Sequence, residues 1–180
     1  RAAENHITQT GFTHPPTDSW YADNGESDAY DIYVFELGPS LFGYTQMEYE
    51  ADNGSGNNAF SAAEEINAAT SYIAMRNNYQ NFPLNEQESV QVTAAHELFH
   101  AIQFGYDGWE AIWMLEASAV WIEDEVFDDI NDNYQYLKDW LDEPHIALNQ
   151  DSAPHWYGSW IFFRYLSEHI GGPSTVRKIF

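Results

Sequence analysis

The residues best suited to chemistry lie in segment 96–100, which reads His-Glu-Leu-Phe-His within a strongly helical stretch. Residues four apart share one face of a helix, so His96 and His100 can direct two imidazoles at one ion. Glu97 is rotated by about 100° around the helix axis, which keeps it out of direct coordination but near a metal-bound water. Zinc suits this arrangement because it binds imidazole nitrogen and leaves one position open for water.

A zinc site of this kind needs a third protein ligand, and Glu116 is the favoured residue. It follows His100 by 16 residues and opens a run of small residues in an otherwise bulky apolar helix. A carboxylate buried on such a face is costly unless it meets a cation or a hydrogen-bond donor. Glu123 lies on the same face two turns further on, where it either accepts a hydrogen bond from a ligand histidine or replaces Glu116 as the third ligand. Glu110, at the start of the helix, is a weaker alternative.

The elements that must hold these residues divide the chain into two parts. β-Branched and aromatic residues predict strands at 31–37, 43–49 and 69–76, with a short helix at 61–67. A helix is then predicted from Asn85 or Ser89 to Phe104, with Gly105 as the residue that ends it. Further helices are predicted at 109–127, 133–141 and 155–169, and from Ser174 onward. Strands followed by helices indicate an α+β fold, in which an antiparallel or mixed sheet precedes a helical C-terminal half.

The composition excludes several classes of function. Lys and Arg number 6 against 29 Asp and Glu, which gives a formal net charge of −23 over 180 residues. A chain this acidic repels phosphate, so neither nucleic acid nor an anionic membrane surface is an expected partner. The absence of cysteine excludes disulfides, thiol catalysis and Cys-based zinc sites. No apolar run approaches the roughly 18 residues of a membrane span.

Taken together, these residues resemble the gluzincin metallopeptidases. The resemblance is closer to a family of secreted bacterial and archaeal metallopeptidases, and it covers about residues 28–180. It rests on the His-Glu-x-Phe-His-Ala-Ile-Gln segment at 96–103, the run from Trp113 to Asp124 and the pair Tyr157-Gly158. Two features depart from the pattern: Ala117 stands where related runs often have glycine, and the spacing to Glu116 is shorter than in thermolysin-like enzymes.

The resemblance implies a set of roles. Zn²⁺ would bind His96, His100 and Glu116, while Glu97 would take a proton from water and pass it to the leaving amine. A donor for the oxyanion is implied just before the 155–169 helix, with Tyr157 favoured over His155. Strand 69–76 is similar to the edge strand that holds an extended substrate in zincins. The fold implied is a zincin-like metallopeptidase domain at 31–180, preceded by an irregular segment at 1–30 and forming part of a longer chain.

The predicted function is therefore zinc-dependent hydrolysis of peptide bonds in a peptide or protein substrate. The surplus of Asp, Glu, Asn and Tyr over Lys is typical of a secreted or a salt-adapted protein surface, and we predict an extracellular or cell-surface location. The alternative is a non-catalytic zincin-like surface, adhesion or filament-forming protein, but the intact Glu97 favours an enzyme because a purely structural metal site needs no general base. Oxygen-rich segments at 23–28, 52–58 and 123–132 offer ligands for Ca²⁺, although none fits the EF-hand pattern.

Overall fold

The computed structural model describes residues 9–22, 24, 27, 29–51 and 67–180. The predicted helix at 61–67 lies outside these residues except for its last position, as do the predicted loop at 52–58 and most of segment 23–28. The described part is an α+β fold, in which a three-stranded sheet precedes a helical half. Among the described helices, none is both long enough and apolar enough to cross a membrane.

The sheet is mixed, as predicted. Its strands are β1 (Ile32–Phe35), β2 (Gly43–Glu50) and β3 (Ala69–Arg76), in the order β1-β3-β2. β1 runs parallel to β3 and β2 runs antiparallel to it, with Thr45 opposite Ile73. The expectation that strand 69–76 lies at an edge is wrong, because it pairs on both sides and is buried over most of its length. The edge strand next to the helices is β2.

Helix α2 (Glu86–Asp107) carries the His-Glu-x-x-His segment, and its start follows the sequence prediction. The Asn85 side chain accepts a hydrogen bond from the backbone N–H of Glu88, and the Glu88 side chain accepts one from the backbone N–H of Asn85. This capping box satisfies backbone donors that would otherwise lack partners at the helix start. The helix continues through Gly105 and ends at Gly108, so the predicted end at Gly105 is wrong. Gly105 instead allows the ring of Pro16 to approach the helix closely.

Helices form the rest of the chain, at nearly the predicted places. The elements are α3 (Ile112–Val126), a 3₁₀ turn η2 (Asp132–Tyr136), α4 (Leu137–Asp142), α5 (His155–Gly158), α6 (Trp160–Leu166), a π-helical turn η3 (Ser167–Gly171) and α7 (Ser174–Arg177). The predicted helix at 155–169 is interrupted at Ser159, whose buried hydroxyl donates to the carbonyl of His155 and accepts from Trp140 Nε1.

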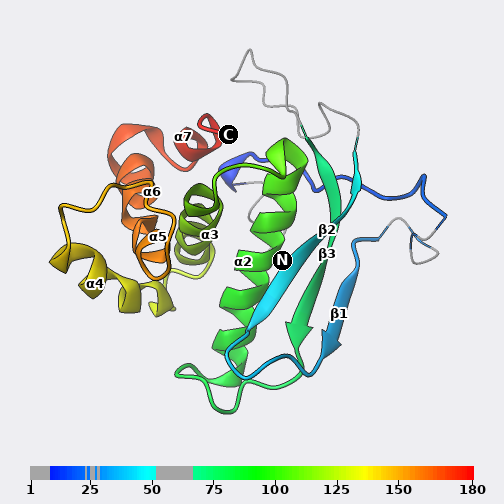
Figure 1. Cartoon of the computed structure of the whole chain (residues 1–180), viewed down its shortest axis with the longest axis horizontal. Helices are drawn as coiled ribbons and strands as arrows, with labels where there is room; N and C mark the ends of the chain where they lie inside the picture. Colours follow the sequence, from blue (N-terminus) through cyan, green and yellow to red (C-terminus); the bar gives the residue numbers. More distant parts are fainter. Residues whose placement is uncertain (1–8, 23, 25–26, 28, 52–66) are drawn as a thin grey trace.

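Helix α2 is the central element of the molecule. Figure 1 shows it between the sheet on one side and α3 on the other, with α5 and α6 beyond α3. Phe99 of α2, Trp121 of α3 and Phe163 of α6 are fully buried where the three helices meet. Small side chains at Ala117, Ser118 and Ala119 are also fully buried, and they let α3 lie close to α2. This close packing brings side chains of the two helices within hydrogen-bonding distance of one another.

Gly105 provides a test of how tightly α2 is packed. Alanine has a higher helix propensity by about 1 kcal/mol, so an isolated helix would gain stability from Gly105→Ala. In the protein, the added Cβ would lie 2.9 Å from Cδ of Pro16, and the rigid ring cannot turn away. Because such overpacking costs about 1–3 kcal/mol, we expect the free energy of unfolding, measured by urea titration, to fall by about 1 kcal/mol.

Gly38→Ala is the matched control for this measurement. A Cβ at Gly38 would meet no atom within 4 Å, so this variant should unfold at the wild-type urea concentration. A Gly105→Ala protein at least as stable as the wild type would contradict the close approach of Pro16 to α2.

Candidate metal centre

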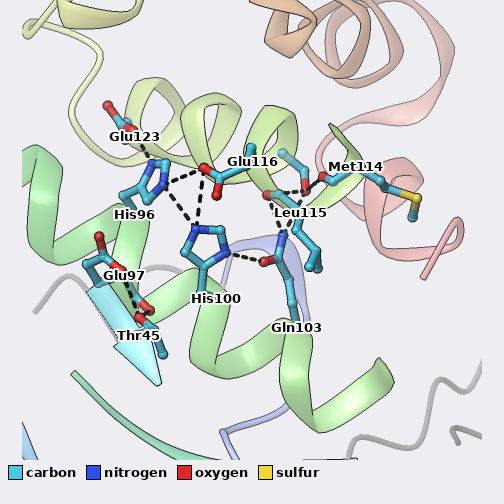
Figure 2. Close-up of polar contacts among 10 residues, drawn as sticks. Thr45, His96, Glu97, His100, Gln103, Met114, Leu115, Glu116 and Glu123 are labelled. Carbon is cyan, nitrogen blue, oxygen red and sulfur yellow. Dashed lines mark hydrogen bonds and ion pairs between the residues drawn. The ribbon is translucent and has the colours of Figure 1, made fainter. Parts of the chain in front are cut away.

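Two helices direct three ligand-type side chains at one point (Figure 2). His96 and His100 come from successive turns of α2, and Glu116 comes from α3. The two Nε2 atoms are 3.0 Å apart, and Oε2 of Glu116 lies 3.3 Å from Nε2 of His96 and 3.7 Å from Nε2 of His100. All three side chains are largely buried, with exposed fractions of 15%, 10% and 23%. The structure therefore assembles the His, His and Glu predicted from the sequence.

A hydrogen bond behind each imidazole fixes which nitrogen carries the proton. Nδ1 of His96 lies 2.6 Å from Oε1 of Glu123, and Nδ1 of His100 lies 2.7 Å from Oε1 of Gln103. A carboxylate oxygen and an amide oxygen both accept, so each Nδ1 is the donor, and in the neutral imidazole the lone pair is on Nε2. Glu123 thus occupies the supporting position behind His96 that was one of its two predicted roles, and it faces away from the point where the Nε2 atoms meet.

The donor set fits a divalent cation such as zinc. Two imidazole Nε2 atoms and one carboxylate oxygen face each other across 3.0–3.7 Å, and in the neutral imidazoles this arrangement is repulsive unless a metal ion lies among them. Two histidines and one glutamate form a ligand set typical of catalytic zinc, with Nδ1–H donated to an outer acceptor in each imidazole. The ligand atoms of His96, His100 and Glu116 all lie within 4.8 Å of one another.

The pKa shifts of His96, Glu116 and Glu123 show how charge is distributed at this site. Burial lowers the pKa of His96, but hydrogen bonds to Glu116 and Glu123 outweigh burial and raise that pKa well above its usual value. Burial raises the pKa of Glu116, yet the charge and hydrogen bonds of His100 and His96 hold it well below its usual range. Burial raises the pKa of Glu123 to about 7, against the opposing effect of His96. The group therefore strongly favours a positive charge at its centre.

Glu97 lies beside this group and is oriented by the sheet. Its side chain is buried, and Oγ1 of Thr45 on β2 lies 2.8 Å from both its backbone oxygen and its Oε2. β2 can approach this closely because Gly43 has no side chain: a Cβ there would lie 2.9 Å from Thr93 and 3.0 Å from Cγ of Glu97. Glu97 is thus held next to His96 without joining the three converging ligand atoms (Figure 2).

A cavity of about 250 Å³ opens next to His96 and Glu97. Its lining residues come from the 40–43 segment, α2, α3, η2 and α5: Ser40, Leu41, Phe42, Gly43, Val92, Thr93, His96, Glu97, Glu123, Asp132, Tyr136 and Tyr157. The 40–42 wall is anchored from β3 and the segment after it. Nη1 of Arg76 donates to the carbonyl of Leu41 at 2.5 Å, and the hydroxyl of Tyr79 donates to the carbonyl of Phe42 at 3.1 Å.

The two predicted oxyanion donors lie in different places. Tyr157 lines the cavity, and burial together with the charge of Glu116 raises its pKa. His155 is buried with Nε2 3.1 Å from the carbonyl of Ala147 and its ring stacked on Trp140, outside the set of described residues that line the cavity. The structure therefore brings Tyr157, and not His155, to the site.

Sequence reasoning missed Asp132, Tyr136 and Gln103 as parts of this site. The ring of Tyr136 stacks on that of Tyr157 with centroids 5.0 Å apart, and burial raises the pKa of its hydroxyl. Asp132 and Tyr136 reach the cavity from a segment that is distant from α2 in the sequence, so no local pattern marks them. Only Gln103 had a signal, since it stands one turn after His100 on the same helix face.

The remaining acidic candidates have other partners. Glu110, the weaker alternative for the third ligand, accepts a hydrogen bond from the backbone N–H of Ala111 at 2.7 Å. In the oxygen-rich segment 123–132, Oδ2 of Asp124 forms an ion pair with Arg164 at 2.7 Å. Glu125 and Asp128 of the same segment also lie within ion-pair distance of Arg164, at 3.5 and 3.8 Å. Calcium binding stays a prediction.

Searches of protein-family models, curated proteins and solved structures find no match to this chain. The fold and site therefore define its class by themselves. It is an α+β protein with a candidate divalent-metal centre made by two histidines on one helix and a glutamate on the next.

Removal of the third ligand tests the metal centre. We expect the purified wild-type protein to bind zinc, and Glu116→Gln to lower the zinc affinity by more than about 100-fold. The reason is that Gln keeps the shape of Glu116 but removes the charge that faces both Nε2 atoms, and groups that only support a ligand typically contribute about 10–100-fold. Competition with a fluorescent chelator measures the affinity.

Glu110→Gln makes the same chemical change outside the group and should bind zinc as the wild type does. An equal loss of affinity in both variants would indicate a general charge effect, and wild-type affinity in Glu116→Gln would remove this residue from the site.

Proposed function

We propose that this protein is a zinc-dependent peptidase of the gluzincin type. The observation that carries the proposal is the convergence of His96, His100 and Glu116 next to a cavity that His96 and Glu97 line. A purely structural metal site has no need of a carboxylate held at its side or of a cavity that reaches it. Zinc bound by the three side chains would polarise the substrate carbonyl and lower the pKa of a water molecule.

Glu97 is the proposed general base. It borders the cavity next to His96, and Thr45 and Gly43 of β2 fix its position from the opposite side. From there its carboxylate takes a proton from the attacking water and delivers that proton to the leaving amine. Because Thr45 is within hydrogen-bonding distance of Oε2, the carboxylate is oriented before substrate arrives.

Tyr157 is the proposed donor to the oxyanion. Tyr157 lines the cavity from α5, and its ring stacks on that of Tyr136. A hydroxyl in this place donates a hydrogen bond to the oxygen that becomes negative as water adds to the carbonyl.

The edge strand β2 is the proposed support for the substrate main chain. Within the described sheet it pairs only with β3, and its first residue, Gly43, lines the cavity. An extended peptide can add to such an edge through main-chain hydrogen bonds and place its carbonyl near Glu97. Secretion to the outside of the cell stays a prediction from composition.

Glu97→Gln tests catalysis separately from metal binding. Gln has the same shape but cannot accept the proton, so we expect zinc to bind as in the wild type while kcat falls by about 10²–10⁴-fold. Cleavage of an internally quenched peptide library gives kcat, and chelator competition gives the zinc affinity.

Tyr157→Phe, measured alongside, should keep zinc and lower kcat by about 10²–10³-fold through loss of the oxyanion donor. A wild-type protein that binds zinc fully and cleaves no peptide would support the non-catalytic surface, adhesion or filament-forming alternative instead.

The charge of the cavity indicates the kind of substrate. Its lining includes the carboxylates of Glu97, Glu123 and Asp132, and no Lys or Arg among the described residues. Glu97 and Glu123 already serve the centre, whereas Asp132 accepts a hydrogen bond only from Gln135, at 2.9 Å, among the contacts of the described residues. A half-buried carboxylate that forms no ion pair with a Lys or Arg of the described residues favours a Lys or Arg side chain next to the cleaved bond.

Asp132→Asn tests this preference. Because a charge-assisted hydrogen bond contributes about 1.5–3 kcal/mol, kcat/KM for peptides with Lys or Arg at the selected position should fall by about tenfold or more. Peptides with Leu at that position should be cleaved as before. Asp139→Asn, an exposed change outside the lining, is the control, and an equal effect on basic and apolar peptides would refute the preference.

A further inference from the structure

Gln103 is a buried amide whose polar atoms all have partners. It lies one turn after His100 on α2 and is fully buried. Its Oε1 lies 2.7 Å from Nδ1 of His100, and its Nε2 donates to the carbonyl of Leu115 at 3.0 Å and to Oγ of Ser118 at 2.9 Å. A buried amide with every group satisfied is rigid, because losing any one bond leaves an unpaired polar atom.

The orientation of this amide is forced by α3. The carbonyl of Leu115 can only accept, and Ser118 uses its own proton to donate to the carbonyl of Met114 at 2.6 Å. The NH₂ group of Gln103 must therefore face α3, which leaves its oxygen facing His100. This oxygen accepts only from a protonated Nδ1, so in the neutral ring of His100 the lone pair lies on Nε2, which faces Glu116 (Figure 2).

The same amide also holds the third ligand. Leu115 and Ser118, its two partners on α3, flank Glu116 on either side. Gln103 thus links the helix that carries both imidazoles to the turn that carries the carboxylate. We propose that Gln103 is a positioning residue, which sets the protonated nitrogen of His100 and the register of Glu116 at once. This inference rests on the metal centre of the proposed function but not on peptide hydrolysis.

Glu and Leu, which are similar to Gln in size, do not meet these requirements. A Glu at this position would turn an oxygen toward the carbonyl of Leu115, so that two acceptors would face each other across the 3.0 Å that the amide now bridges. A Leu would fill the space but leave Nδ1 of His100 without its acceptor and remove the hydrogen bonds to Leu115 and Ser118. The amide also adds no charge, unlike the carboxylate of Glu123 behind His96.

The first experiment measures the tautomer of His100 in zinc-free wild-type protein labelled with ¹⁵N-histidine. We expect long-range ¹H–¹⁵N spectra to show His100 protonated on Nδ1, and in Gln103→Leu the Nε2-protonated form should appear. Competition for zinc with a fluorescent chelator should show affinity about 10–100-fold below wild type for Gln103→Leu. Ser118→Ala, which leaves the Leu115 carbonyl as partner, should lose less affinity than Gln103→Leu.

Gln87→Leu is the matched control, since it makes the same change at an exposed position of the same helix and should bind zinc as the wild type does. His100 protonated on Nε2 in the zinc-free wild type would overturn the inference without any variant, as would unchanged zinc affinity in a folded Gln103→Leu protein. A wild type that binds zinc with the expected dependence on Gln103 but cleaves no peptide would refute the peptidase and leave this inference standing.

Discussion

The structure depends on three ligand-type atoms that meet in the contact between two helices. Nε2 of His96, Nε2 of His100 and Oε2 of Glu116 come within 3.0–3.7 Å of one another, and each Nδ1 atom has its own acceptor on the other side of the ring. Such atoms stay close only when a proton or a metal ion lies between them. The rest of the fold keeps them in place: α2 is capped at its start and packed on both sides, and small residues of α3 allow the helices to approach.

Burial of these polar side chains costs free energy, and the packing around them fixes their geometry. Carboxylates and imidazoles in a helix contact lose water, so each must find a partner within the protein. Glu123 and Gln103 meet this need from the two ends of the contact, one with a charge and one without. Aromatic side chains of the core, including Phe99 and Trp121, surround the same contact and resist its rearrangement. A site fixed by packing does not have to be organised when a ligand arrives.

Residues from several separate segments of the chain line the cavity. β2 contributes Gly43 and the support of Glu97, the segment before it forms a wall anchored by Arg76 and Tyr79, and the helical half contributes a stacked pair of tyrosines. The glycine in β2 is needed because a Cβ there would lie 2.9 Å from Thr93 and 3.0 Å from Cγ of Glu97. Sheet, central helix and helical half therefore meet at the place where chemistry is proposed, which explains why α2 lies between the other two layers.

The sequence by itself determined whatever depends on neighbours along the chain. The spacing of His96 and His100, the start of α2 at Asn85 and the strands at 43–49 and 69–76 follow from local periodicity and capping, and the structure has them nearly as predicted. Tertiary structure decided which element meets each face. It placed strand 69–76 at the centre of the sheet, carried α2 past Gly105 and put Glu116 rather than Glu123 opposite the Nε2 atoms. Periodicity fixes which side chains share a face, but the partner of that face comes from distant segments whose packing no local pattern records.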